Sequence, residues 1–192
     1  MNVSSQSFAD FRNSLANLAG SVQETGLSDD ERLARARSTF IAKLNRRTAV
    51  DMETCIHCGM CAEACHFYIA TEDQRYTPAY KIDPLRRFYR REVSPLRLLY
   101  RPFTRKMDLD ELKEWSELVY EACTGCGRCD MMCPMGINIS EGINIMREGL
   151  AAAGLVPDEL SALQAEQRQS NSLFGVGAAE LKAVAAELAQ HG

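Results

Sequence analysis

Eight cysteines are the residues whose type and spacing could do chemistry in this chain, and they fall in two short runs. The first run contains Cys55, Cys58, Cys61 and Cys65, and the second contains Cys123, Cys126, Cys129 and Cys133. Both runs follow the spacing C-x2-C-x2-C-x3-C, and together they use every cysteine of the chain. Cysteine thiolates bind zinc and iron–sulfur clusters, so the runs indicate metal coordination.

The spacing within each run suits an iron–sulfur cube better than a zinc ion. Three thiolates in one short loop can reach three corners of a 4Fe-4S cluster, and a fourth ligand displaced along the chain closes the last corner. Gly59, Gly125 and Gly127 can adopt positive φ and turn backbone N–H groups toward the cluster sulfides. A zinc site needs two separated ligand pairs, typically about a dozen residues apart, which neither run provides. We therefore expect two 4Fe-4S clusters.

Two histidines accompany the first run: His57 lies inside it and His66 directly follows it. Histidine replaces cysteine as an iron ligand in some clusters, but the cysteines already supply enough ligands for two cubes. We therefore expect both histidines to pack or to form hydrogen bonds near a cluster. His66 stands where the second run has Pro134, so the two runs form a degenerate repeat.

The length of 192 residues allows one compact core, or a small domain with helical extensions. No apolar run approaches the roughly eighteen residues that would span a bilayer, so no direct membrane span is expected. The chain shows no apolar N-terminal signal region. We therefore expect a reducing, cytoplasmic location, where the thiols serve as ligands rather than forming disulfides.

Charge is spread unevenly along the chain, although the formal net charge is only -4. Residues 75–106 carry 10 basic and 2 acidic side chains and include several aromatic residues. Aromatic and basic residues together can bind single-stranded nucleic acid, but here the aromatics recur with Leu85, Leu96, Leu98 and Leu99 at core-like spacings. We expect no nucleic acid partner. A solvated helical face and a docking surface for an acidic protein, steered by Arg86, Arg87, Arg90 and Arg91, both stay open.

The elements that must position the cysteines carry helical signals. Ser28 and Glu31 form a capping box before apolar residues at helical spacing, which predicts a helix over about 29–46. Asp83-Pro84 and Ser94-Pro95 each place an N-cap residue before a proline, which predicts short helices over about 84–92 and 95–101. Asp108 precedes a third helix that leads into Cys123. Its apolar stripe contains Leu109, Leu112, Trp115, Leu118 and Val119, and its polar face contains Asp110, Glu111, Lys113, Glu114 and Glu117.

The flanking segments also carry helical patterns. Residues 1–27 show a weak pattern, which fits either a frayed terminus or a partner-binding helix. Ser140 is expected to cap a helix that ends near Gly154, and a further helix opens at Pro157. We expect a linker over 167–172 and a final helix over 178–188.

The two cysteine runs and the long helical insert between them resemble an α-helical ferredoxin domain. That domain is shared by the iron–sulfur subunits of succinate dehydrogenase and fumarate reductase and by the C subunit of heterodisulfide reductase. The resemblance covers about residues 50–150. It is strongest to proteins like this heterodisulfide reductase C subunit, in the stretch from Cys58 to Tyr68, in Thr77-Pro78-Ala79-Tyr80-Lys81 and in Leu85-Arg86-Arg87.

This resemblance implies an all-α fold in three parts. Residues 1–49 would form an N-terminal helical extension, residues 50–150 the α-helical ferredoxin domain, and residues 151–192 a C-terminal helical extension. By the ferredoxin rule, the fourth cysteine of each run binds the cluster of the other run. One cluster would then be held by Cys55, Cys58, Cys61 and Cys133, and the other by Cys123, Cys126, Cys129 and Cys65.

The same resemblance implies an electron-transfer subunit of a heterodisulfide reductase-like complex. Electrons would pass between a flavoprotein A-like subunit and a thiol- or disulfide-active, catalytic B-like subunit, with sulfur metabolism as one setting. The sequence lacks the plant-type ferredoxin cysteines of succinate dehydrogenase subunits and the cysteine-rich repeats of the heterodisulfide reductase B subunit. It also lacks glycine fingerprints for flavin or nicotinamide, so we expect no catalytic site in this chain. An independent soluble ferredoxin, an iron–sulfur interaction module and a cluster-based redox sensor are the alternatives.

Overall fold

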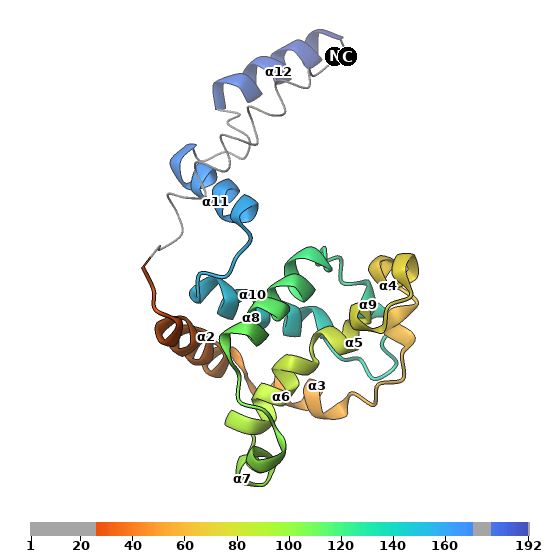
Figure 1. The fold of residues 1–192 in the computed structure, drawn as a ribbon. Helices are drawn as coiled ribbons and strands as arrows, with labels where there is room; N and C mark the ends of the chain where they lie inside the picture. Colours follow the sequence, from red (N-terminus) through yellow and green to blue (C-terminus); the bar gives the residue numbers. More distant parts are fainter. Residues whose placement is uncertain (1–25, 171–177, 192) are drawn as a thin grey trace. The chain divides into compact units, whose positions relative to one another are not determined.

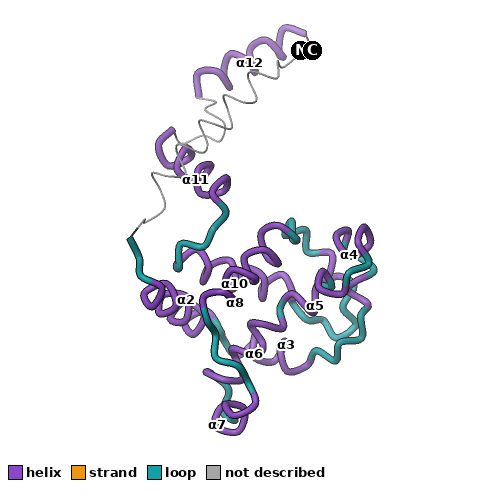
Figure 2. The backbone as a smooth tube through the Cα atoms, in the orientation of Figure 1, coloured by secondary structure: helices purple, strands orange, loops and turns teal. Residues whose placement is uncertain are grey.

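The computed structural model describes residues 26–170 and 178–191, and every regular element within them is a helix (Figures 1 and 2). The expected all-α fold is thus confirmed. Residues Leu27–Val156 form one compact unit, whereas α11 (Asp158–Ser170) and α12 (Ala178–His191) belong to a second. None of the described helices is both long and apolar enough to cross a membrane.

The first described helix, α2 (Asp29–Lys43), begins at the capping box expected from the sequence. The Ser28 side chain accepts a hydrogen bond from the Glu31 N–H, and the Glu31 carboxylate accepts the Ser28 N–H at 2.9 Å. Two orphan donors of the first helical turn are satisfied in this way. The start of the helix is therefore set by local sequence.

The expected extension of that helix to residue 46 is wrong, because a second helix, α3 (Arg46–Thr54), begins after Asn45. The Asn45 side chain accepts hydrogen bonds from the N–H groups of Arg47 and Thr48, and the Thr48 hydroxyl accepts the Asn45 N–H at 2.9 Å. This second capping box breaks the helix and starts a new one that leads directly to Cys55.

Short elements fill the segment between the two cysteine runs: η1 (Met60–Ala62), α4 (His66–Thr71), η2 (Gln74–Tyr76), α5 (Pro78–Lys81), α6 (Asp83–Glu92), α7 (Arg97–Tyr100) and η3 (Arg101–Phe103). Helix α6 agrees with the expected range, although Ile82 rather than Asp83 is its N-cap. Helix α7 starts later than expected, because the Ser94 hydroxyl accepts the Leu96 N–H in a turn that precedes the helix.

The leucines of this segment do not share one environment. Leu85 is fully buried, as its spacing suggested, but Leu96, Leu98 and Leu99 are 57, 75 and 63% exposed. The core-like role expected for these three is therefore wrong. Their spacing was helical, but the helix they form presents them to solvent.

Four elements surround the second cysteine run: α8 (Leu109–Ser116), the π-helical η4 (Glu117–Glu121), α9 (Arg128–Met131) and α10 (Ile139–Ala152). Asp108 caps α8 as expected, by accepting the Glu111 N–H at 2.9 Å. Leu112, Trp115 and Val119 from the expected stripe are buried. Glu111 was assigned to the polar face but is buried as well, where it forms an ion pair with Arg87 at 3.0 Å.

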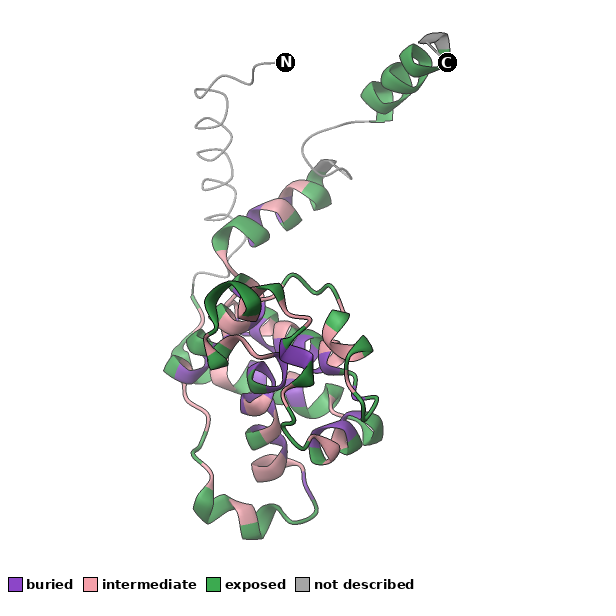
Figure 3. Cartoon of the chain, turned by 90° about the vertical axis from the view of Figure 1, so that its right-hand side faces the viewer, coloured by how far each residue is buried: buried purple, intermediate pink, exposed green. Residues whose placement is uncertain are grey.

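The core forms where α10 packs against α2. Figure 3 shows buried residues gathered in the interior of unit 27–156. A Cβ atom at Gly149 would lie 2.0 Å from the Phe40 ring, so only glycine permits this close approach. The same ring contacts Phe88 and Trp115, with centroids 5.3 and 5.5 Å away.

Helix α10 is capped by Asn138 rather than by Ser140. Its buried N-terminal end lies beside the cysteines and its C-terminal half joins the core.

In the second unit, α12 confirms the expected final helix, but α11 continues to Ser170 through part of the expected linker. The helical pattern in residues 1–27 lies almost wholly outside the described residues, as do residues 171 and 172 of that linker. The compact unit 27–156 already includes α2, because that helix packs on α10. The three-part division at residues 49 and 150 stays a prediction.

Candidate metal centre

The two cysteine loops share one backbone conformation. The third position of each run has positive φ, with 53° at His57 and 69° at Gly125. The fifth position also has positive φ, with 84° at Gly59 and 69° at Gly127. The positive φ expected for the three glycines is thus confirmed. The repeat seen in the sequence is therefore also a repeat of backbone geometry.

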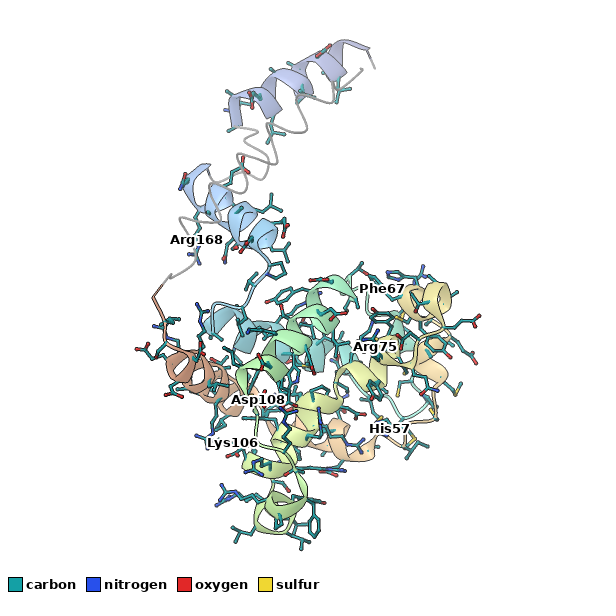
Figure 4. The ribbon with its side chains drawn as sticks, viewed as in Figure 1. His57, Phe67, Arg75, Lys106, Asp108 and Arg168 are labelled. Atoms are coloured by element: carbon teal, nitrogen blue, oxygen red, sulfur yellow. The ribbon has the colours of Figure 1, made fainter. Side chains whose placement is uncertain are left out.

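His57, labelled in Figure 4, occupies a left-handed position that its counterpart fills with glycine, and contacts from α6 hold it there. Its Nε2 lies 2.9 Å from a carboxylate oxygen of Asp83 and 3.2 Å from Nη1 of Arg86. Arg86 also donates to the carbonyl oxygen of Cys55 at 3.0 Å. These contacts offset the backbone strain of a non-glycine residue at positive φ. His57 thus has the hydrogen-bonding role expected from the sequence, while the ring of His66 packs beside Phe67.

Two hollows in unit 27–156 collect the eight cysteines in two groups of four. Cys55, Cys58, Cys61 and Cys133 line one hollow, and Cys65, Cys123, Cys126 and Cys129 line the other. Each group takes three cysteines from one run and the fourth from the other. The grouping is the one that crossed ligation requires.

The two hollows are neighbours, because Ile139 lines both of them. Ile139 is the first residue of α10 and is only 2% exposed. It follows the second run closely, so the chain turns from the ligands into α10 at this point. A single buried side chain thus contributes to the walls of both sites.

The chemistry of the donor groups fits an iron–sulfur cluster. Burial raises the pKa of the Cys61 thiol, and burial together with the Asp130 carboxylate raises the pKa of Cys129 to about 12. Such thiols stay protonated at neutral pH unless a metal binds them as thiolates. No three Cys, His, Asp or Glu side chains in the described residues converge closely enough for a single metal ion. A cube spaces its thiolates more widely, because iron and sulfide atoms lie between them.

The buried position of Lys81 beside the second hollow was not predicted from the sequence. Its side chain is buried, with Nζ donating to the Ala122 carbonyl oxygen and lying 3.7 Å from Sγ of Cys65. The ammonium group also lies 5.1 Å from the Phe67 ring centroid and 5.9 Å from that of Tyr76. Lys81 forms no ion pair with a carboxylate of the described residues. A buried positive charge therefore faces the second hollow.

Arg147 supports the second cysteine loop from α10. Its guanidinium donates to the carbonyl oxygen of Cys123 at 2.6 Å and to that of Val119 at 2.9 and 2.6 Å. These carbonyls lie in and just after the π-helical turn η4, where the regular α-helical pattern is interrupted. Asp130 fixes the other side of the loop by accepting the Ser140 N–H at 2.9 Å and the Ser140 hydroxyl. The loop is thus tied to α10 at two points.

The arginines expected to steer an acidic partner have partners within unit 27–156. Besides the Arg86 contacts, Arg87 pairs with Glu111 at 3.0 Å and Arg90 with Glu53 at 2.8 Å. Arg91 donates to the carbonyl oxygens of Arg101 at 2.8 Å and Thr104 at 2.5 Å. These contacts favour a structural role for all four over partner steering.

Comparison with known proteins agrees with this geometry. Residues 54–138 match the family described as a 4Fe-4S dicluster domain. The chain is 33% identical over 132 residues to the Hdr-like menaquinol oxidoreductase iron-sulfur subunit 2 of Archaeoglobus fulgidus, a match that covers 67% of this chain and 24% of that protein. It is 34% identical over 113 residues to the Hdr-like menaquinol oxidoreductase iron-sulfur subunit of Archaeoglobus profundus, covering 58% of this chain and 20% of the relative.

A third relative is the D subunit of the dihydromethanophenazine:CoB--CoM heterodisulfide reductase of Methanosarcina mazei, 29% identical over 109 residues. That match covers 56% of this chain and 26% of the relative. The chain thus spans about a quarter or less of the length of these relatives, and no solved structure matches it significantly. The cysteine geometry and these matches support a heterodisulfide reductase-like iron–sulfur protein.

Proposed function

We propose that the chain is an electron-transfer subunit that relays electrons through two 4Fe-4S clusters. Cys55, Cys58, Cys61 and Cys133 would hold one cluster, and Cys123, Cys126, Cys129 and Cys65 the other. When bound, each cluster supplies a centre that is reduced and reoxidised at a potential set by its charge, hydrogen bonds and burial. The dicluster match and the two hollows support the count of two.

The observation that carries this proposal is the adjacency of the two cysteine hollows through Ile139. A relay needs two centres that are close together. The buried Ile139 side chain indicates this closeness, because it lines both sites. The crossed fourth ligands also fix the two loops to each other.

The protein residues do no covalent chemistry in this account. The cysteines position the centres, the loop glycines turn N–H groups toward them, and the Gly125 N–H lies 3.4 Å from Sγ of Cys123. Lys81 and Arg147 place positive charge beside the second loop. These groups determine where an added electron is most stable.

We further propose that the relay joins a flavoprotein A-like subunit to a catalytic, thiol- or disulfide-active B-like subunit. The names of the relatives support a place among such oxidoreductases, since they refer to a menaquinol oxidoreductase and to a heterodisulfide reductase. In this proposal, substrate turnover belongs to the partners. Sulfur metabolism is one setting for such a complex, and ligand thiols favour the reducing cytoplasm.

An anaerobic experiment on the purified chain tests the relay. We expect a reduced viologen dye to bleach the visible absorption of both clusters, while thiol and disulfide substrates give no turnover. The complex isolated from its source should contain a flavoprotein and a second redox subunit. Turnover by the chain alone would overturn the assignment to a relay, and isolation without either subunit would favour an independent ferredoxin.

A further inference from the structure

The segment that follows α6 presents large apolar side chains to solvent. Leu96, Leu98, Leu99 and Phe103 are 57, 75, 63 and 84% exposed, and all four lie within α7, η3 and the residue before them. Figures 1 and 3 show α7 projecting from the rest of unit 27–156. Single exposed leucines are ordinary on protein surfaces, but four large apolar side chains within eight residues form a patch.

Hydrogen bonds and a cation–π contact hold the projecting segment against α6. Arg91 donates to the carbonyl oxygens of Arg101 and Thr104, and the Thr104 hydroxyl donates to the Tyr100 carbonyl oxygen at 2.9 Å. Arg90 lies 5.6 Å from the centroid of the Tyr100 ring. Arg91 of α6 thus holds η3 and Thr104 in place. The apolar side chains are left as the outer surface.

The charge around the patch has one sign. Residues 93–107 contain four basic side chains and no acidic one: Arg97, Arg101, Arg105 and Lys106. All four are exposed. The nearest carboxylates on either side are Glu92, which pairs with Arg37 at 2.9 Å and with Arg101 at 3.8 Å, and Asp108, which pairs with Arg105. Arg97 and Lys106 form no ion pair with the described residues, so an anionic surface would meet these two cations beside an apolar centre.

We propose that residues 96–103 insert into the surface of an anionic lipid bilayer. The apolar side chains would enter the boundary between headgroups and acyl chains, while the flanking arginines and Lys106 bind lipid phosphates at headgroup level. A bilayer fits better than an acidic protein because the apolar side chains project from the unit and line neither the cysteine hollows nor the groove beside α2, although the flanking Arg105 and Lys106 do line that groove. Contact with lipid is non-directional and needs no complementary pocket.

Flotation of the cluster-loaded chain with lipid vesicles tests this proposal. We expect binding to phosphatidylcholine vesicles that contain about a third phosphatidylglycerol, weaker binding to phosphatidylcholine alone, and a decrease with salt. The double variant Leu98→Glu and Leu99→Glu should bind at least about tenfold more weakly, because it removes apolar burial and adds like charge. The matched control is Leu181→Glu with Leu188→Glu on α12, where the leucines are 60 and 68% exposed. It should bind like the unchanged chain.

A second measurement does not depend on a disruptive substitution. The chain has one tryptophan, Trp115, which is 2% exposed. Leu98→Trp adds a second at the patch, and brominated lipids should quench its fluorescence while leaving that of Trp115 unchanged. Failure of the unchanged chain to bind either vesicle type would overturn the proposal and direct attention to an acidic protein partner. Equal binding by the Leu98→Glu, Leu99→Glu variant, or no quenching in vesicle-bound Leu98→Trp, would overturn it as well.

Discussion

The ammonium nitrogen of Lys81 lies 3.7 Å from Sγ of Cys65, in the interior of unit 27–156. Two aromatic rings and the Ala122 carbonyl oxygen complete its surroundings, and none of these groups neutralises the charge. At the first loop, the Arg86 guanidinium lies 3.7 Å from the Asp83 carboxylate, which offsets its charge. Lys81 itself pairs with no carboxylate of the described residues, although the Asp130 carboxylate lies 3.7 Å from Sγ of Cys129 in the same site.

Removing this charge should lower the reduction potential of the cluster that Cys65 helps to hold. At an effective dielectric constant of about 20, a unit charge about 6 Å away contributes about 3 kcal/mol, which corresponds to roughly 100 mV for one electron. We therefore expect Lys81→Met to shift one of the two potentials downward by that order, as measured by redox titration with electron paramagnetic resonance. Lys113→Met on α8 is the control, since that lysine is 60% exposed and screened. Equal shifts in both variants would show that Lys81 has no particular influence on the reduction potential of this cluster.

The crossed ligand sets predict that each fourth cysteine acts on the loop of the other run. Cys65→Ser should alter the spectrum of the cluster in the second loop, and Cys133→Ser that of the cluster in the first. The Lys81→Met shift in potential identifies the cluster of the second loop. If Cys65→Ser removes that cluster, the shift should be absent when Lys81→Met is combined with Cys65→Ser and present when it is combined with Cys133→Ser. The reverse assignment would show that each run closes its own cube.

Positive φ in the loops should matter for cluster retention. Gly127 has φ of 69°, and an added Cβ would meet no atom within 4 Å, so Gly127→Ala introduces backbone strain without a clash. We expect a cost of about 1–2 kcal/mol and faster loss of iron on dilution or exposure to air. Gly26→Ala is the matched control, because its Cβ also meets nothing within 4 Å but its φ lies outside the left-handed region. Unchanged iron retention in Gly127→Ala would mean that the loop adapts without cost.

Stability should depend on pH through Glu92 at the base of the α7 projection. Burial opposes ionisation, but the Arg37 hydrogen bond and the nearby Arg101 and Arg91 outweigh it and hold the pKa of this carboxyl below its ordinary value of 4.5. A lowered folded-state pKa stabilises the fold above pH 4.5 and loses this contribution as pH falls through the folded value. Glu92→Gln should therefore cost about 1 kcal/mol at about pH 7 and much less at a pH below the lowered pKa. Thermal unfolding followed by circular dichroism at both pH values measures the difference, and an equal cost at both would exclude ionisation as its source.

Local sequence predicted the parts of the structure that local chemistry determines. The Ser28 and Asp108 caps, the positive φ of the loop glycines and the buried stripe through Leu112 and Trp115 all follow from residue type and spacing. The Asn45 capping box was equally local but was hidden by the continuing apolar pattern around it. A capping residue such as Asn45 can end one helix and start another even where the apolar residues around it continue at helical spacing.

Tertiary contacts determine what the sequence did not predict. Lysine is seldom fully buried, and only packing against Phe67 and Tyr76 places Lys81 in the interior. Glu111 leaves the polar face because Arg87 from α6 pairs with it. Leu98 and Leu99 have the spacing of a core helix, but periodicity does not say whether another element covers the apolar face, and here none of the described elements does.

The count of iron and acid-labile sulfide in anaerobically purified protein tests the central claim most directly. Two cubes require about eight irons and about eight sulfides per chain, with visible absorption that bleaches on reduction. The same preparation should contain no stoichiometric zinc. Stoichiometric zinc without acid-labile sulfide, or iron for only one cube in protein with all eight cysteines intact, would contradict a two-cluster relay.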